Sequence, residues 1–242
     1  MIPAPAFLSN PERFMAFSRW AAPLFGVVAV LLAIIGLWLG FTAPEDYQQG
    51  QTVRIMFVHV PAAWLASFVY VCLAGASFLA LVFRHVLADA AAQAAAPLGA
   101  AFTLLALATG SLWGRPMWGA WWVWDARLTS VLVLFLLYVA YMALRASLDD
   151  EAKAARAAAI LALVGAINLP IVHYSVDWWN TLHQGASVFR RGGSTLAPVF
   201  LKPLLVMGLA YLAAFGSLWL VRIRGEVWRR RADAAALRAV RG

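Results

Sequence analysis

Six long apolar runs, separated by shorter polar segments, set the pattern of this chain. Each run is free of Asp, Glu, Lys and Arg, and the first, residues 21–41, would measure about 31 Å as an α-helix. This length is sufficient to cross the hydrocarbon core of a bilayer. The pattern therefore predicts an all-α, polytopic membrane protein, a single membrane domain over residues 1–242. Its six transmembrane helices are expected at about 21–41, 57–83, 97–113, 128–144, 157–174 and 203–221.

The segments between the runs are short or polar. Ala88–Ala96 is expected to be a weakly helical linker of small residues, and Asp149–Arg156 a charged connector. Residues 222–242 form a basic cytoplasmic tail, which is either helical or disordered at the surface. The first run is longer than the apolar core of a cleavable signal peptide and ends in a loop with Pro44, so we expect a retained helix.

Composition agrees with a membrane protein, because 64% of the residues are hydrophobic and 12% are charged, against roughly 25% charged in soluble domains. With the N-terminus inside, thirteen Lys and Arg residues lie in the inner segments and six in the outer ones. The positive-inside rule then predicts that both termini are cytoplasmic. Orientation explains the net charge of +8, so no nucleic acid partner is expected. The lone Cys72 excludes an internal disulfide and a CxxC redox site.

The segment Trp113–Ser130 holds five of the twelve tryptophans between two apolar runs. Tryptophan prefers the headgroup level of a membrane, so one interpretation is an aromatic belt that anchors the loop. The other interpretation is a ligand platform. On a helix, four side chains of this segment would share one face: Trp118, Trp121, Trp122 and Asp125. The residues alone leave both interpretations open.

Topology divides the four histidines between the two membrane faces. His85 lies at the inner end of the second run, and a bilayer core of roughly 30 Å separates it from the other three. His59, at the outer start of that run, and His183, in the loop after the fifth run, both lie on the outer side near tryptophans. His173, at the outer end of the fifth run, is expected to have a packing or supporting role and is the alternative ligand to His183.

Two imidazoles, several flat aromatic side chains and nearby arginines suit a planar, apolar, dianionic metal complex. Haem has these properties, since its iron takes axial imidazoles and its propionates pair with guanidinium groups. Arg115 and Arg127 are candidate propionate partners, with a salt bridge between Arg127 and Asp125 as an equal alternative. Zinc is the competing metal, but it usually requires three or four ligands in a tighter cluster.

Three segments resemble a known family. The run WGAWWVWDARLT, residues 118–129, matches the WGxxWxWDxRxT motif of the haem-handling, or WWD-domain, membrane proteins. The sequences FVHVPAAW around His59 and WWNTLHQG around His183 look like the paired histidine segments of that family. With its six predicted spans and its length of 242 residues, the chain resembles the haem exporter protein C (CcmC) family of cytochrome c maturation along nearly its whole length.

The resemblance implies a protein of the bacterial cytoplasmic (inner) membrane, with the Trp-rich loop between helices 3 and 4 in the periplasm. It implies transient binding of haem b, with His59 and His183 as axial ligands of the iron. The other implied cofactor-binding residues are Trp113, Trp118, Trp121, Trp122, Trp124, Asp125 and Arg127. The implied activity is presentation of haem to a CcmE-like haem chaperone, together with a CcmA-like ATPase and CcmB-like and CcmD-like membrane subunits.

The sequence has no nucleophile, acid–base pair or nucleotide motif that would make it a stand-alone enzyme, so its expected part in haem attachment is promotion within a complex. Two alternatives remain. A b-type cytochrome electron-transfer subunit usually holds haem between histidines deep in its spans. A transmembrane haem transporter should have a ligand path across the midplane, and Pro61, Asn168 and Pro170 keep this alternative open.

Overall fold

The computed structural model describes residues 10–185 and 187–241, and these residues are mostly helical. Six helical segments are long and apolar enough to cross a membrane, which confirms the predicted all-α membrane architecture. A short 3₁₀ helix, η1 (Gln51–Ile55), precedes α2. The α-helices are α1 (Pro11–Phe41), α2 (Met56–Phe83), α3 (Val86–Trp118), α4 (Ala126–Ala146), α5 (Glu151–Gly165), α6 (Asn168–Trp178) and α7 (Pro198–Arg241).

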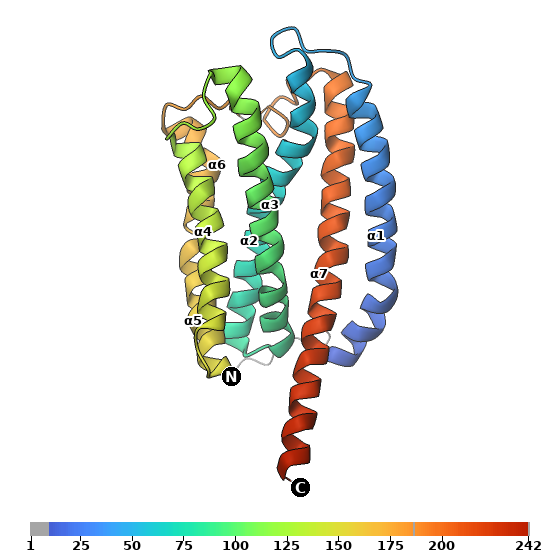
Figure 1. Cartoon of the computed structure of the whole chain (residues 1–242), viewed down its shortest axis with the longest axis vertical. Coiled ribbons are helices and arrows are strands. Elements are labelled where there is room, and N and C mark those ends of the chain that lie inside the picture. Colours follow the sequence, from blue (N-terminus) through green and yellow to red (C-terminus); the bar gives the residue numbers. More distant parts are fainter. Residues whose placement is uncertain (1–9, 186, 242) are drawn as a thin grey trace.

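The long helices run side by side in a bundle with connecting loops at both ends (Figure 1). α1 packs mainly on α7, α2 packs on α3, and α4 contacts α3, α5 and α6. The start of α1 and the end of α7 lie at one end of the bundle, which we call the tail end. The α3–α4 and α6–α7 connections lie at the opposite end, which we call the loop end (Figure 1).

Several helices extend beyond the apolar runs. α1 begins at Pro11, because the Asn10 side chain caps it by accepting backbone N–H groups of the first turn. α3 begins at Val86, so the expected linker Ala88–Ala96 forms its first turns. Alanine is the strongest helix former, and its small side chain allows several of these residues to be fully buried against neighbouring helices. α7 continues through the tail to Arg241, which is the helical one of the two alternatives for this segment.

The fifth apolar run is interrupted between α5 and α6. Pro170 has no N–H to donate to the preceding turn, which weakens the helix at this point. The Asn168 side chain donates from Nδ2 to the backbone carbonyl of Ser130 on α4 over 2.9 Å, and both residues are buried. The Asn168 amide therefore has a partner within the protein, as a membrane environment requires.

Tyrosines of α2 and α4 form the centre of the bundle. Tyr70 and Tyr138 are fully buried with ring centroids 5.0 Å apart, and the Tyr138 hydroxyl donates to the Ala66 carbonyl over 2.8 Å. A β-carbon added at Gly99 would lie 2.0 Å from the Tyr138 ring, and one at Gly165 would lie 2.1 Å from the Tyr70 hydroxyl. Glycine at these two positions therefore makes room for the two rings.

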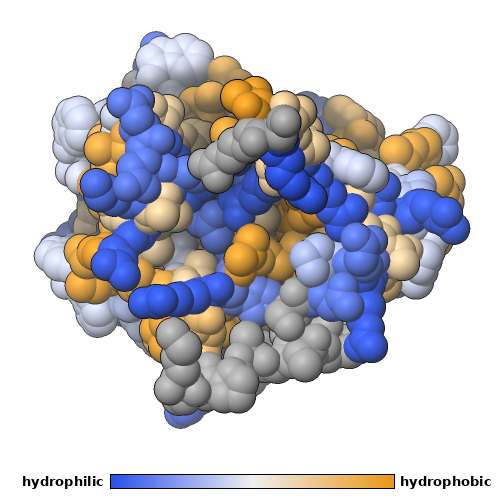
Figure 2. Space-filling model, turned by 90° about the horizontal axis from the view of Figure 1, so that it is seen from below, coloured by the Kyte–Doolittle hydropathy of each residue, from blue (hydrophilic) through white to orange (hydrophobic). Residues whose placement is uncertain are grey.

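Ion pairs join the helices at the tail end. The Asp89 carboxylate on α3 pairs with Arg145 on α4, over 2.8 Å, and with Arg230 on α7. Glu226 pairs with both Arg229 and Arg230. Figure 2 views this end of the molecule and shows hydrophilic residues spread over the face. Part of the basic tail thus pairs with carboxylates of the bundle.

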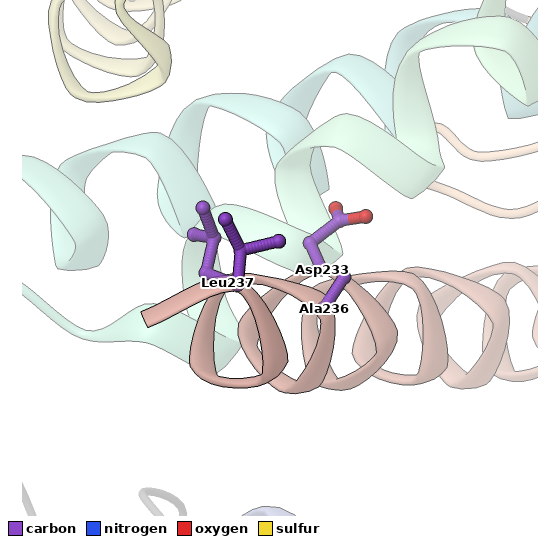
Figure 3. A pocket seen from close by; sticks show the side chains of 4 residues that line it. Asp233, Ala236 and Leu237 are labelled. Carbon is purple, nitrogen blue, oxygen red and sulfur yellow. The ribbon is translucent and has the colours of Figure 1, made fainter. Parts of the chain in front are cut away.

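A shallow hollow lies beyond these ion pairs, near the end of α7 (Figure 3). The residues that line it all come from this one helix: Asp233, Ala236, Leu237 and Val240. The hollow therefore lies at the opposite end of the molecule from the histidines of the loop end.

Candidate functional site

Residues from four separate segments meet at the loop end. His59 lies in the first turn of α2, and Trp113 and Trp118 lie in the last turns of α3. Asp125 is the N-cap of α4, and His183 lies in the loop between α6 and α7. The bundle thus brings to one end the residues that the sequence singled out as candidate haem ligands and their aromatic neighbours.

His59 is held by residues of α3. Its Nδ1 atom lies 3.1 Å from the Thr109 Oγ1 atom, and its ring meets Trp113 edge-on with centroids 5.7 Å apart. The close contact between the His59 ring and α3 depends on Gly110, because a β-carbon there would lie 2.8 Å from Cε1 of His59. Trp113 is fixed in turn, because its Nε1 donates to the Gln49 side chain over 3.1 Å.

His183 is held by the end of α3 and the start of α4. Its Nδ1 atom lies 3.3 Å from Oδ2 of Asp125, and its ring meets Trp118 edge-on with centroids 4.8 Å apart. Asp125 is positioned by its capping role, since its Oδ1 accepts the Leu128 N–H over 2.7 Å. Burial lowers the pKa of His183 below its ordinary value and outweighs the Asp125 carboxylate, which raises it. The imidazole is therefore neutral at pH 7.

The two imidazoles are linked through the last turns of α3, because His59 contacts Thr109 and Trp113 and His183 contacts Trp118. In each ring, Nδ1 is the nitrogen that faces a protein oxygen. Histidines that bind a metal usually have the other ring nitrogen fixed in this way by a hydrogen-bond partner. The donor chemistry of the two rings thus fits axial coordination of haem iron.

A zinc site finds no comparable support. Within residues 10–185 and 187–241, no group of three or more His, Cys, Asp or Glu side chains is placed to hold a metal ion. A structural zinc site usually needs four such ligands and a catalytic one needs three. The described side chains therefore offer no cluster of the kind that zinc usually requires.

The Trp-rich segment forms a loop between α3 and α4, as predicted, so the face that Trp118, Trp121, Trp122 and Asp125 would share on a helix does not form. α3 ends at Trp118, because Gly119 adopts a left-handed conformation with φ of 77° that favours glycine. The next residues form an irregular loop as far as Asp125, where α4 is capped.

The tryptophans of this loop form an exposed apolar surface. Trp121 and Trp124 are 56% and 74% exposed, which is far more than a packing role requires. Trp122 meets Trp124 edge-on with ring centroids 5.4 Å apart. The backbone carbonyl of Trp121 accepts a hydrogen bond from the Ser111 hydroxyl over 2.7 Å, which ties the loop to α3.

The two candidate propionate partners make hydrogen bonds within the protein. Arg127 donates from Nε to the Ser175 hydroxyl over 2.6 Å and from Nη2 to the His173 carbonyl over 3.3 Å. Arg127 thus ties α4 to α6, while Asp125 faces His183. Arg115 donates to the carbonyl of Gly119 at the end of α3.

The remaining histidines have surroundings of other kinds. His173 is exposed on α6 and its ring meets that of Tyr174 with centroids 4.6 Å apart. His85 lies at the tail end, where its Nδ1 caps α3 by accepting the Ala88 N–H over 3.1 Å. His85 therefore has a structural role as a helix cap, and it lies at the opposite end from His59 and His183, as its position in the sequence predicted.

Three residues around His59 and Trp113 could not be singled out from the sequence. Thr109 and Gly110 lie within the third apolar run, where small residues usually serve helix packing, and nothing near Gln49 marks it as a partner of a tryptophan. One signal was present. Thr109 and Trp113 are four residues apart, so that they share a helix face and can contact the same side chain on a neighbouring helix.

Comparison with known proteins places these features in a family context. The CcmC family model, described as Heme exporter protein C, matches residues 5–238. The Heme exporter protein C of Bradyrhizobium diazoefficiens is 60% identical over 224 residues, which cover 93% of this chain and 85% of the relative. That of Escherichia coli is 47% identical over 221 residues, 91% of this chain and 89% of the relative. A putative cytochrome c biosynthesis ccmC-like mitochondrial protein of Marchantia polymorpha is 45% identical over 202 residues, 80% of this chain and 85% of the relative.

Proposed function

Because the chain belongs to the Heme exporter protein C (CcmC) family of cytochrome c maturation, we propose that it binds haem b transiently at the loop end and presents it to a CcmE-like haem chaperone. One observation carries the proposal: two imidazoles, each with Nδ1 facing a protein oxygen, both contact the last turns of α3, next to a loop with exposed tryptophans. Haem is the cargo in this account, and the chain is a component of a transport and maturation system.

His59 and His183 would be the axial ligands of the haem iron. Trp113 and Trp118, which pack edge-on against these rings, would keep the imidazole planes in place. The porphyrin has large apolar faces, and burial of such surface against aromatic side chains is favourable. The side chains of the exposed loop offer that surface, and they are also the groups that a docking chaperone would meet: Trp121, Trp122 and Trp124.

The chain contributes positioning in this mechanism. The histidines hold the cargo at one end of the bundle, and the exposed loop leaves that end accessible to a partner. Holding two reactants in one geometry can supply about 7–11 kcal/mol of a reaction barrier by itself. Covalent attachment of haem to the chaperone would therefore be promoted within a complex, while the reacting groups belong to haem and the chaperone.

We place the loop end in the periplasm and both termini in the cytoplasm of a bacterial inner-membrane protein. The distribution of Lys and Arg supports this orientation, with thirteen on the tail side and six on the loop side. A CcmA-like ATPase would then meet the tail end, and CcmB-like and CcmD-like subunits would contact the helices within the bilayer.

The test compares three histidine variants. His59→Ala and His183→Ala should each lose most of the haem that copurifies with the chain and should lower the yield of haem-loaded chaperone. His173→Ala is the matched control, because its side chain is exposed and only its backbone carbonyl binds Arg127. Unchanged haem content and yield in both His59→Ala and His183→Ala would remove the ligand assignment.

Transport of haem through the bundle is the second candidate function, and the break between α5 and α6 is the observation that favours it. The Asn168 side chain at this break donates to the Ser130 carbonyl. Because this amide already has a protein partner, it is not free to bind a ligand that crosses the membrane at this depth. Haem uptake by vesicles that contain this chain alone would support transport. The b-type cytochrome alternative would be supported if the purified chain held one stable, stoichiometric haem that cycles reversibly between its oxidised and reduced forms and reduces quinone.

A further inference from the structure

The hydrogen bonds of Thr109 fix the protonation pattern of His59. The Thr109 hydroxyl lies 2.6 Å from the Leu105 carbonyl, to which it donates its single proton. Its contact with Nδ1 of His59 at 3.1 Å must therefore be one in which the hydroxyl oxygen accepts. The proton of the neutral His59 ring is thus on Nδ1, and the lone pair that can bind iron is on Nε2.

Asp125 has the same effect on His183 through a different chemical group. Its Oδ1 accepts the Leu128 N–H, so its Oδ2 is the oxygen that faces Nδ1 of His183. A carboxylate can only accept, so Nδ1 of His183 also carries the proton and Nε2 has the lone pair. The Asp125 side chain is only 6% exposed, so water screens this interaction little.

The hydrogen-bond partners of the two histidines differ in charge, since Thr109 is neutral and Asp125 is a carboxylate. The histidines also lie in different kinds of element. A hydrogen bond to an ionised acceptor is about twice as strong as a neutral one, and it increases the basicity of the ring that donates it. His59 lies on a long helix, whereas His183 lies in an irregular loop. Asp125 should therefore orient the His183 ring more firmly than Thr109 orients the His59 ring. It should also make Nε2 of His183 a stronger donor to iron than Nε2 of His59.

We propose that Thr109 and Asp125 are positioning residues for the two iron ligands, and that Asp125 makes His183 the stronger donor of an unequal pair. This inference rests on the proposed function, since it requires haem at His59 and His183. It assigns to the acidic residue of the Trp-rich motif a role in orienting a histidine, in addition to its capping of α4.

Three conservative variants of the full-length chain test the inference by absorption spectroscopy of the copurified haem. Thr109→Val keeps the shape of the side chain and removes the hydroxyl, whereas Thr109→Ser keeps the hydroxyl. Asp125→Asn remains a good N-cap, but its one oxygen serves Leu128 and its NH₂ group then faces His183. That arrangement favours the tautomer with the proton on Nε2, which cannot bind iron.

Asp125→Asn should convert most of the low-spin haem to the high-spin form, Thr109→Val should convert a smaller part, and Thr109→Ser should match the wild type. Added free imidazole should restore the low-spin spectrum in both affected variants, which a loss of structure alone would not allow. The reduction midpoint potential of the haem that Asp125→Asn retains should be higher than that of the wild type. Far-UV circular dichroism checks that each variant is folded.

The outcomes separate this inference from the proposed function. Low-spin spectra and potentials that stay unchanged in Asp125→Asn and Thr109→Val would overturn the positioning roles, while the haem site itself would stand. Equal effects of the two variants would overturn the unequal pair. Absence of bis-imidazole haem from the wild type would instead contradict the proposed function, and the inference with it.

Discussion

At the scale of single residues, the side chains at the loop end are fixed by contacts from elements other than their own. His59 on α2 is held by Thr109 and Trp113 of α3, and His183 is held by Asp125 and Trp118. Each ring therefore has one hydrogen-bond partner and one aromatic neighbour. Such contacts restrict the orientation of a ligand before the cargo arrives, which lowers the entropy lost on binding.

Gly110→Ala tests whether this restriction matters for haem. The added methyl group would lie 2.8 Å from the His59 ring, so the ring must turn away from Thr109. Overpacking typically costs about 1–3 kcal/mol, and replacement of glycine by alanine within a helix returns about 1 kcal/mol of it, so stability should fall only modestly. We expect a several-fold lower ratio of haem to protein, measured by the absorbance of purified samples. Gly75→Ala is the control, because nothing lies within 4 Å of the added carbon, and an equal ratio in the two variants would refute the role of Gly110.

At the scale of helices, close packing at the centre of the bundle depends on pairs of a large ring and a glycine. The buried rings of Tyr70 and Tyr138 occupy the space that side chains at Gly165 and Gly99 would fill. The Tyr138 hydroxyl is also committed to a backbone carbonyl of α2. Helices α2, α3, α4 and α5 are therefore held at a spacing that larger residues would not allow.

Gly99→Ala should weaken the packing of α3 on α4. The new β-carbon would lie 2.0 Å from the ring of the fully buried Tyr138, and overpacking of this kind typically costs about 1–3 kcal/mol. We expect a lower midpoint of thermal unfolding in detergent. Gly225→Ala in α7, which has no neighbour within 4 Å of the added carbon, should keep the wild-type midpoint or raise it slightly. A wild-type midpoint for Gly99→Ala would show that the helices relax freely.

At the scale of the whole molecule, the two ends of the bundle have different chemistry. The tail end is joined by ion pairs between α3, α4 and α7, while the loop end has histidines and exposed tryptophans. Under the proposed function, the tail end would stabilise the bundle and the loop end would contact the cargo and the chaperone. Substitutions at the tail end should therefore affect folding without changing the haem spectrum.

Asp89→Ala provides that comparison. The side chains of Arg145 and Asp89 are only 6% and 15% exposed, and loss of one partner of a buried ion pair costs about 3–5 kcal/mol. We expect a clearly lower thermal midpoint with an unchanged spectrum of the bound haem. Glu12→Ala, which breaks an exposed pair with Arg231, should change stability by less than about 1 kcal/mol. An altered haem spectrum in Asp89→Ala would show that the two ends are coupled.

The helices could be predicted from the sequence because a membrane span needs a long run without charge. Their ends depended on other forces, since alanine propensity extends α3 to Val86 and ion pairs hold the helical tail of α7. The loop-end location of His59 and His183 followed from topology and motif. The contact of Thr109 with His59 could not be predicted, because it depends on how α2 and α3 pack. The irregular course after Trp118 had a signal in Gly119, a residue that commonly ends helices.

Ligation of haem iron by His59 and His183 is tested most directly by the absorption spectrum of the purified chain in its oxidised and reduced forms. We expect the low-spin spectrum of haem with two imidazole ligands for the wild type. We also expect that His59→Ala and His183→Ala each lose this spectrum and that free imidazole restores it. A low-spin spectrum that persists in both variants, or haem that is absent from the wild type under all conditions, would refute this ligation.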